Sequence, residues 1–305
     1  MASGQERAIR RRIKSVQSTK KITRAMELIA ASRIVKAQQR VAAARPYSEQ
    51  ITEVMRALAA SGAAEDHPLM EERDPVRTVG FVVIAADRGL AGAYNSAILR
   101  RAEREMQARR AEGKDIALIT SGSKALGYFR YREWEIEEGY TGYAEQPSYD
   151  DARRLGQAVV SRYEEGEMDQ VELVYTRFFS VGSQKVVVVR LLPLDQDEIE
   201  DMAGDDGDAT YEMEPEPERI LEELLPRYVD ARIFAALLDA AASEQAARQR
   251  AMKAATDNAE ELTKQLSVTA NKLRQASSGK EDLLPDNLVT RDILRDQLDP
   301  SGVGV

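Results

Sequence analysis

The chain has 305 residues, a formal net charge of −9 at pH 7 and no cysteine. This length is enough for one large or two small domains. The absence of cysteine excludes disulfide bonds, thiolate metal sites and thiol nucleophiles. No stretch approaches the roughly 18 consecutive apolar residues that a membrane span requires, and the basic start is not followed by the apolar segment of a secretory signal. We therefore expect a protein exposed to the cytoplasm.

The sequence offers little for catalysis. The single histidine, His67, lies in a polar stretch with turn residues, which is typical of a solvated loop histidine. Without cysteine, and with this one histidine, the common pairs of nucleophile and general base are nearly unavailable. Carboxylate or lysine chemistry remains formally open. We predict no catalytic residue, no cofactor and no metal site.

Charge is distributed unevenly along the chain. Residues 1–60 hold 13 lysine and arginine residues against four glutamates, a net charge of +9. Residues 195–223 hold 14 acidic residues against one arginine, a net charge of −13. Solvated helix and loop surfaces would account for both segments, but the basic end also suits an acidic partner or passage through a charged ring.

The segment 1–61 is predicted to form one long helix. No glycine follows Gly4 and no proline precedes Pro46 in this segment, and its lysine, arginine, glutamine and glutamate residues are good helix formers. Pro46 is expected to kink the helix or to divide it in two. Apolar or small residues recur mostly at steps of three, four and seven, the spacing of one helix face: Ile9, Ile13, Val16, Ile22, Met26, Ile29, Ala37, Val41 and Ala44.

The segment 75–194 changes to an alternating pattern. Four apolar runs indicate buried strands: 79–85, 116–119, 171–175 and 186–192. Three segments between them indicate helices: 95–112, 123–131 and 149–164. Strands that alternate with helices form βαβ units and a largely parallel sheet covered on both faces. We predict a central Rossmann-like α/β domain, followed by a flexible acidic linker at 195–217.

A second long helix is predicted at 218–276. Its apolar and small residues alternate in steps of three and four, which is heptad spacing: Leu238, Ala241, Gln245, Arg248, Met252, Ala255, Ala259, Leu262, Leu266, Thr269, Leu273 and Ala276. At 1.5 Å per residue such a helix is about 85–90 Å long, so it must project from a compact domain. We predict that it pairs with the N-terminal helix in a long antiparallel coiled coil. An ordinary spacer coiled coil would have the same pattern.

Two segments resemble ligand-binding motifs. Val82–Leu99 reads as a strand, a turn with Gly89 and Gly92, and a helix, and such turns can hold phosphate at the helix N-terminus. The segment lacks the glycine spacing of dinucleotide-binding turns and the lysine of a P-loop, which favours a simple structural turn. The basic cluster at 10–14 could contact nucleic acid, but the acidic chain lacks interleaved aromatic residues there, so we expect no nucleic-acid partner.

Three segments resemble the gamma subunit of F-type ATP synthase, which is the central rotor shaft of that complex. These are RRIKSVQSTKKITRAMELIAASRIVKAQ (Arg11–Gln38), AADRGLAGAYN (Ala85–Asn95) and the long run Glu214–Ala276, which contains ASEQAARQRAMKAATDNA. Together they cover about a third of the chain. One departure lies at Ser277–Leu288, where 12 residues stand in place of one in the family pattern. Gly279 and Pro285 are expected to interrupt the helix there, so 277–305 is an atypical extension.

The resemblance implies a subunit that transmits rotation. The family's helical pair lies inside a hexamer of alpha and beta subunits, and its α/β domain contacts the epsilon subunit and the c-ring. Proton flow turns the ring and the attached shaft, and the ATP chemistry occurs on beta. The chain would then be a peripheral protein at the cytoplasmic face of a bacterial cell membrane, associated with that membrane through the c-ring.

The same resemblance implies residues that contact the beta subunit. Arg274 and Gln275 match the pair that engages a beta-subunit loop. Met26 matches the segment where the ring of subunits grips the shaft, with Lys20, Lys21 and Arg24 beside it and able to meet acidic residues. A solvated charge or a seam residue is the alternative interpretation at each position.

Two other classes of protein remain open on the sequence. One is a coiled-coil scaffold or adaptor that derives from a gamma subunit but has no rotor activity, which the atypical extension would suit. The other is a nucleotide-dependent α/β enzyme with helical arms. Co-purification with alpha and beta subunits would argue against the scaffold, and hydrolysis of a nucleotide by the isolated chain would favour the enzyme.

Overall fold

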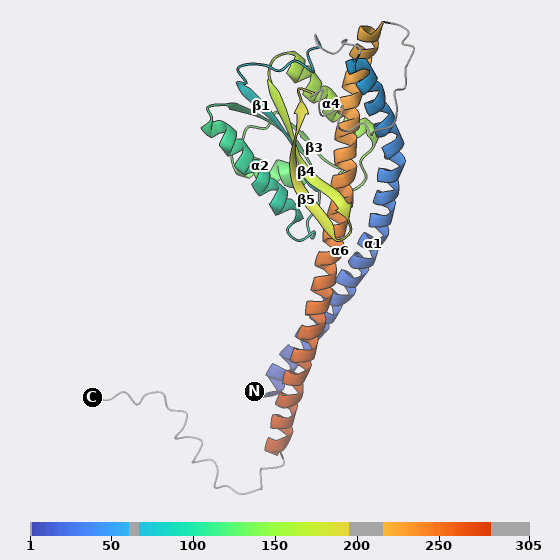
Figure 1. Ribbon diagram of the computed structural model, residues 1–305. Coiled ribbons are helices and arrows are strands. Elements are labelled where there is room, and N and C mark those ends of the chain that lie inside the picture. Colours follow the sequence, from blue (N-terminus) through green and yellow to red (C-terminus); the bar gives the residue numbers. More distant parts are fainter. Residues whose placement is uncertain (1, 61–66, 195–215, 282–305) are drawn as a thin grey trace, which may run out of the picture. The chain divides into compact units, whose positions relative to one another are not determined.

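A computed structural model describes residues 2–60, 67–194 and 216–281 (Figure 1). The chain divides into two compact units. The paired-helix unit is formed by residues within 1–24 and 254–305, and the α/β unit by residues 25–253. Nearly all of the predicted acidic linker, and the predicted extension from residue 282 onward, lie outside the described residues.

Two long helices begin and end the described chain. Helix α1 runs Ala2–Ala60 and helix α6 runs Pro217–Glu281, and each contributes to both units. Pro46 and Pro226 lie inside these helices. The prediction of two long terminal helices is confirmed, and α1 is one helix through Pro46 rather than two.

The helices of the paired-helix unit are antiparallel. Lys20 of α1 contacts Glu260 of α6 at 3.0 Å, and Thr23 contacts Thr256 at 2.8 Å, so rising numbers on one helix meet falling numbers on the other. Thr23, Thr256 and Ala259 are buried at this seam. Small side chains let the two backbones approach closely but bury little apolar area in each layer.

The predicted helix faces are wrong at three positions. Ile22 and Ile29 are 59% and 52% exposed, whereas the neighbouring Thr23 and Ala30 are buried. On α6, Thr269 is exposed and Ala270 is buried. The sequence pattern assigned the larger residue of each neighbouring pair to the buried face. In the structure the smaller residue of each pair is buried, as close contact between helices favours.

The α/β unit contains one sheet of five strands, in the order β3-β2-β1-β4-β5. In chain order, its elements are β1 (Thr78–Ile84), α2 (Tyr94–Ala111), β2 (Asp115–Ser121), α3 (Ser123–Tyr131), β3 (Glu138–Tyr140), α4 (Tyr149–Glu164), β4 (Gln170–Ser180) and β5 (Ser183–Leu192). The pairs β1–β2, β1–β4 and β2–β3 are parallel, and β4–β5 is an antiparallel hairpin. Sequence reasoning missed β3, because three residues that include a glycine and a glutamate carry no apolar pattern.

Helices cover both faces of the sheet in the α/β unit (Figure 1). On one face, Phe81 and Val83 of β1 pack in a cluster with Ile98 and Met106 of α2. On the other face, α4, α6 and the end of α1 share a cluster with the sheet, in which the fully buried α1 residues are Met55 and Leu58. The predicted α/β fold is therefore confirmed, and the end of α1 forms part of its core.

The C-terminal helix is longer than predicted. Helix α6 continues to Glu281, so Gly279 does not interrupt it. A glycine inside a helix costs only about 1 kcal/mol relative to alanine, which a helix of 65 residues can accommodate. Pro285 lies outside the described residues.

Gly122 is the position where the fold most depends on a glycine. It joins β2 to α3 with a φ of +97°, and a Cβ there would lie 2.1 Å from the carbonyl oxygen of Ala85. We expect Gly122→Ala to lower the free energy of unfolding by about 2–4 kcal/mol in urea denaturation. Gly127, inside α3, has open space around its Cα, so Gly127→Ala should stabilise by about 0.5–1 kcal/mol. Equal effects of the two changes would contradict the role assigned to Gly122.

Candidate functional site

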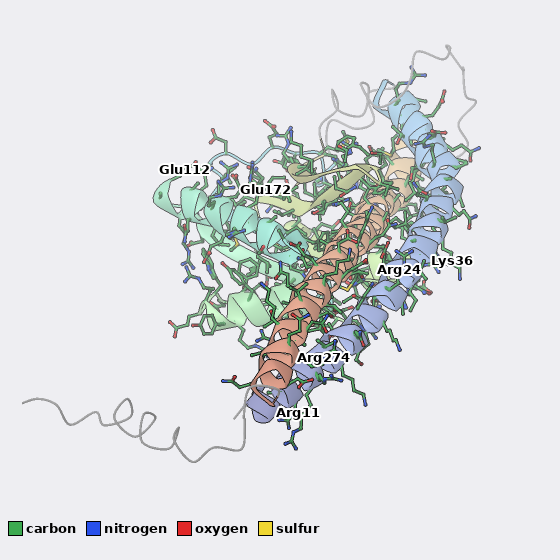
Figure 2. All side chains as sticks on the ribbon, turned by 90° about the horizontal axis from the view of Figure 1, so that it is seen from below. Arg11, Arg24, Lys36, Glu112, Glu172 and Arg274 are labelled. Carbon is green, nitrogen blue, oxygen red and sulfur yellow. The ribbon has the colours of Figure 1, made fainter. Side chains whose placement is uncertain are left out.

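Five of the six predicted contact residues lie in the paired-helix unit. Lys20, Lys21 and Arg24 lie on α1, and Arg274 and Gln275 lie on α6. Met26, half-buried on α1, belongs to the α/β unit. Figure 2 labels Arg24 and Arg274 on their helices.

Lys20 is already bound within the chain. Its ammonium lies 3.0 Å from Glu260, and Lys264 lies 3.4 Å from the same carboxylate. The hydrogen bond from Lys20 is the main cause that lowers the pKa of Glu260, followed by the bond from Lys264. All three side chains are partly exposed, so this cluster adds little stability but fixes how the helices align.

Arg274 and Gln275 lie near the end of the described part of α6, and both are exposed. They are 14 and 15 residues beyond Glu260, which is about 20 Å along a helix. The antiparallel register set by Lys20 and Glu260 places them beside the first turns of α1, which carry exposed arginines such as Arg11. A guanidinium and an amide at such a position can bind a carboxylate or backbone carbonyl of another chain.

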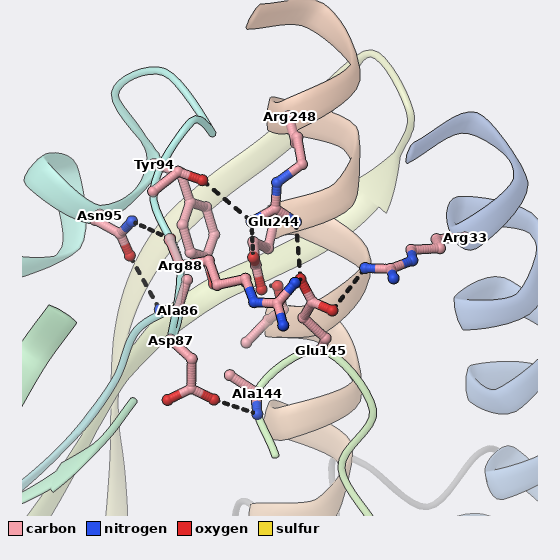
Figure 3. Close-up of polar contacts among 12 residues, drawn as sticks. Arg33, Ala86, Asp87, Arg88, Tyr94, Asn95, Ala144, Glu145, Glu244 and Arg248 are labelled. Carbon is pink, nitrogen blue, oxygen red and sulfur yellow. Dashed lines mark hydrogen bonds and ion pairs between the residues drawn. The ribbon is translucent and has the colours of Figure 1, made fainter. Parts of the chain in front are cut away.

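Sequence reasoning missed a buried ionic cluster in the α/β unit, drawn in Figure 3. Arg248 and Glu244 of α6 form an ion pair in which their side chains are 7% and 1% exposed. Arg248 also lies 3.7 Å from Glu145 in the loop between β3 and α4. Glu145 in turn binds Arg33 of α1 at 2.6 Å and lies 3.9 Å from Arg88 in the loop after β1.

This ionic cluster joins four segments that are distant in sequence. Arg248 donates to the carbonyl oxygen of Gly89 at 3.3 Å, so α6 is also tied to the loop after β1. The signal that could have found it was present, since Gln245 and Arg248 were polar residues on a predicted apolar face. A buried arginine requires a carboxylate partner, and Glu244 one turn away was the nearest.

The loop after β1 is held by its own side chains. Asp87 accepts hydrogen bonds from the backbone amides of Ser123, Gly142 and Ala144 at 2.9–3.0 Å. Burial alone would raise the pKa of Asp87, but these hydrogen bonds outweigh it and lower the pKa. The side-chain oxygen of Asn95 accepts a hydrogen bond from the backbone amide of Ala86 at 3.0 Å, and its side-chain nitrogen donates to the backbone carbonyl of Arg88. The aspartate and the asparagine thus hold the loop after β1 in its conformation.

The described residues contain no group of three or more His, Asp or Glu side chains that could hold a metal ion. In the same part of the chain, no helix is both long and apolar enough to cross a membrane.

The pKa of Glu244 yields a test of the ionic cluster. Burial raises the pKa of the Glu244 carboxyl, whereas the positive charge of Arg248 lowers this pKa. A carboxyl whose pKa rises on folding stabilises the folded state most at low pH, and this stabilisation is lost as the pH rises through the folded-state pKa. Arg248→Met removes the opposing charge, so the variant should lose about 3–5 kcal/mol at pH 8 and clearly less at pH 5, measured by urea denaturation.

Two variants control this experiment. The double variant Glu244→Gln with Arg248→Met has no titrating group at position 244. The difference between its stability losses at pH 8 and at pH 5 should therefore disappear. Arg104→Met, at an exposed arginine of α2, should change stability by no more than about 0.5 kcal/mol. A loss in Arg248→Met that is the same at both pH values would contradict the assigned role of Glu244.

Known proteins resemble this chain along nearly its whole length. A family model described as ATP synthase matches residues 5–281. The ATP synthase gamma chain of Frankia casuarinae is 50% identical over 283 residues, which are 92% of this chain and 95% of that protein. The gamma chain of Mycolicibacterium smegmatis is 45% identical over 290 residues, which are 90% of this chain and 94% of that protein.

Solved structures show the same fold. A chain of the rotor of Euglena gracilis mitochondrial ATP synthase matches with a TM-score of 0.64 at 21% identity, over 90% of this chain and 99% of that one. A chain from the central stalk and c-ring of Tetrahymena thermophila mitochondrial ATP synthase gives a TM-score of 0.61 at 24% identity, over 77% and 99%. Given the span of the family model and the close identity to curated relatives, the chain belongs to the ATP synthase gamma chain family.

Proposed function

We propose that this chain is the central-stalk rotor subunit of a proton-translocating ATP synthase. Rotation of a membrane-embedded c-ring turns the chain, and the chain passes that rotation to the catalytic beta subunits. The observation that carries the proposal is the 50% identity to a gamma chain over 92% of this chain. The antiparallel helices of the paired-helix unit supply the mechanical element that this task requires.

The rotor acts by contact rather than by chemistry. An asymmetric shaft presents a different surface to each of the three beta subunits that surround it. A surface that binds one conformation of a subunit better than another shifts the population toward the favoured conformation. ATP is formed on the beta subunits, and this chain is the non-catalytic component of the complex.

The surface of α1 suits an enclosing partner. In the α/β unit, Leu28, Ile29 and Val35 of α1 are each more than half exposed. In the paired-helix unit, the first turns of α1 expose a series of basic side chains. Apolar side chains on a helix favour burial against another protein, and the basic ones favour acidic side chains there.

The remaining partners follow from the family. The α/β unit is the part proposed to contact the epsilon subunit and the c-ring, and the alpha subunits complete the ring around the helices. The chain would be held at the cytoplasmic face of a bacterial membrane through these partners. Isolation of the chain from its native cells under mild conditions should yield alpha, beta, epsilon and c subunits, identified by mass. Recovery of the chain without alpha and beta would overturn the proposal in favour of a scaffold.

The proposed beta contact is tested at Arg274 and Gln275. Arg274→Ala together with Gln275→Ala should lower ATP-driven proton pumping in the assembled complex about ten-fold while leaving the melting temperature of the chain unchanged, because both side chains are exposed. The measurement is fluorescence quenching of a pH-sensitive dye in membrane vesicles.

Two controls accompany this double variant. Glu261→Ala with Gln265→Ala changes another exposed pair on α6 and should leave pumping unchanged. Lys20→Ala should have a smaller effect than the double variant, because an ammonium cannot make the bidentate hydrogen bond that a guanidinium can make. Normal pumping and torque in the assembled Arg274 and Gln275 double variant would refute the contact.

A further inference from the structure

Helices α2 and α3 pack on the same face of the sheet in the α/β unit, and the segment that they form is basic. Residues 94–132, from the start of α2 to the residue that ends α3, hold nine lysine and arginine residues against four acidic residues, a net charge of +5. The following residues, 133–194, hold six lysine and arginine residues against twelve acidic ones, a net charge of −6. Positive charge is therefore concentrated on these two helices beside an acidic part of the chain.

Side chains of the two helices form one surface. Arg100 and Arg104 lie one turn apart on α2 and are both exposed. On α3, Lys124, Tyr128 and Tyr131 follow one another at steps of four and three residues, so they share one side of that helix. Burial is the main cause that raises the pKa of Tyr128, and the charges of Arg132 and Arg100 lower this pKa, which places both guanidiniums near the phenol. We name as the basic aromatic surface the side chains of Arg100, Arg104, Lys124, Tyr128, Tyr131 and Arg132.

Tyr131 presents an aromatic ring to solvent, since 84% of the residue is exposed. Tyrosine and arginine are enriched among the residues that contribute most to the affinity of protein interfaces. A tyrosine ring buries a large area with few rotatable bonds, and a guanidinium can make two parallel hydrogen bonds to a carboxylate. The combination of Tyr131 with Arg100 and Arg104 therefore favours a protein partner that carries carboxylates.

Glu103 of α2 holds two members of this surface in place. It is only 9% exposed, and its carboxylate accepts a hydrogen bond from the hydroxyl of Tyr128 at 2.7 Å and from Nε of Arg132 at 2.8 Å. Burial alone would raise the pKa of Glu103, but these hydrogen bonds outweigh burial and lower the pKa, so the carboxylate stays charged at neutral pH. Side chains that are already held in place lose less conformational freedom when a partner binds. This part of the surface is therefore preorganised.

We propose that the basic aromatic surface binds an acidic, amphipathic segment of a partner protein. Carboxylates of that segment would pair with Arg100, Arg104 and Lys124, and its apolar side chains would pack on the ring of Tyr131. Charge complementarity identifies this occupant, since four of the six side chains are cationic and the carboxylate of Glu103, which holds one of these cations, is buried. A nucleic acid fits less well, because its phosphate chain would extend onto the acidic residues that follow α3. This surface goes beyond the rotor function and does not depend on it.

Site-specific photo-crosslinking of the full chain tests the proposal. With p-benzoylphenylalanine in place of Tyr131, the photoreactive group reports contact at this surface alone and keeps an aromatic ring there. The probe is a fluorescent peptide of Glu-Glu-Leu repeats, whose leucines can react with the benzophenone. We expect labelling that saturates, with a half-maximal peptide concentration of about 100 μM or lower. Addition of about 0.5 M salt should reduce the labelling about five-fold, because salt screens exposed charges.

Two double variants of this photoreactive chain remove the same amount of charge. Arg100→Gln with Arg104→Gln should raise the half-maximal peptide concentration about ten-fold, because charge-assisted hydrogen bonds are lost. Arg11→Gln with Arg12→Gln changes two arginines of α1 in the paired-helix unit and should change that concentration by less than about two-fold. All four arginines are exposed, so each variant should keep the melting temperature of the parent chain.

Competition with unlabelled molecules identifies the class of partner. The unlabelled Glu-Glu-Leu peptide should suppress labelling, whereas a neutral peptide of Gln-Gln-Leu repeats, oligothymidylate and phosphatidylglycerol vesicles should each suppress it less. The proposal is overturned if labelling does not saturate, if the two double variants behave alike, or if any of the three other competitors suppresses labelling as strongly as the acidic peptide does.

Discussion

The guanidinium of Arg248 organises the α/β unit, because it lies almost wholly out of water and several segments must meet there to neutralise it. It faces Glu244 on its own helix, Glu145 from the loop before α4, and the carbonyl of Gly89 from the loop after β1. Removal of one partner would leave an unpaired charge inside the protein, which costs far more than an ordinary lost contact. The positions of these loops are therefore linked to α6.

Both long helices depend on small side chains at their contact. Thr23, Thr256 and Ala259 are buried in the paired-helix unit, and Ala30 is buried in the α/β unit. Alanine and threonine allow close approach but bury less apolar area than leucine, so the pairing of helices gains less per layer than a leucine seam does. A helix pair of this kind is stabilised further when another protein surrounds it, which agrees with the exposed Leu28 and Val35 on α1.

The sequence predicted the elements well where periodicity was strong. The three helices of the α/β domain and its four apolar strands lie within a few residues of their predicted positions, because each has a regular apolar face. Strand β3 was missed because it lacks such a face. Helix phase was harder to predict, since Ile22 and Thr23 are neighbours and only close packing decides which one is buried.

The candidate sites likewise contain residues that no periodic pattern in the sequence could identify. The proposed contact residues, such as Arg274, could be named only through a family resemblance, because no pattern in one sequence marks a surface that binds another chain. The ionic cluster depends on Glu145 and Arg33, which are more than a hundred residues apart and meet only in the folded chain.

The polar contacts between the helices also solve a problem of alignment. A seam of alanines packs almost equally well when one helix slips by seven residues, because similar side chains recur at that step. Slippage would separate Lys20 from Glu260 and Thr23 from Thr256, and in the α/β unit a shift of α6 would leave Glu244 and Arg248 without Glu145. The weak apolar seam thus brings the helices together, whereas the polar groups select one register. A shaft that transmits rotation needs that single register more than it needs additional stability.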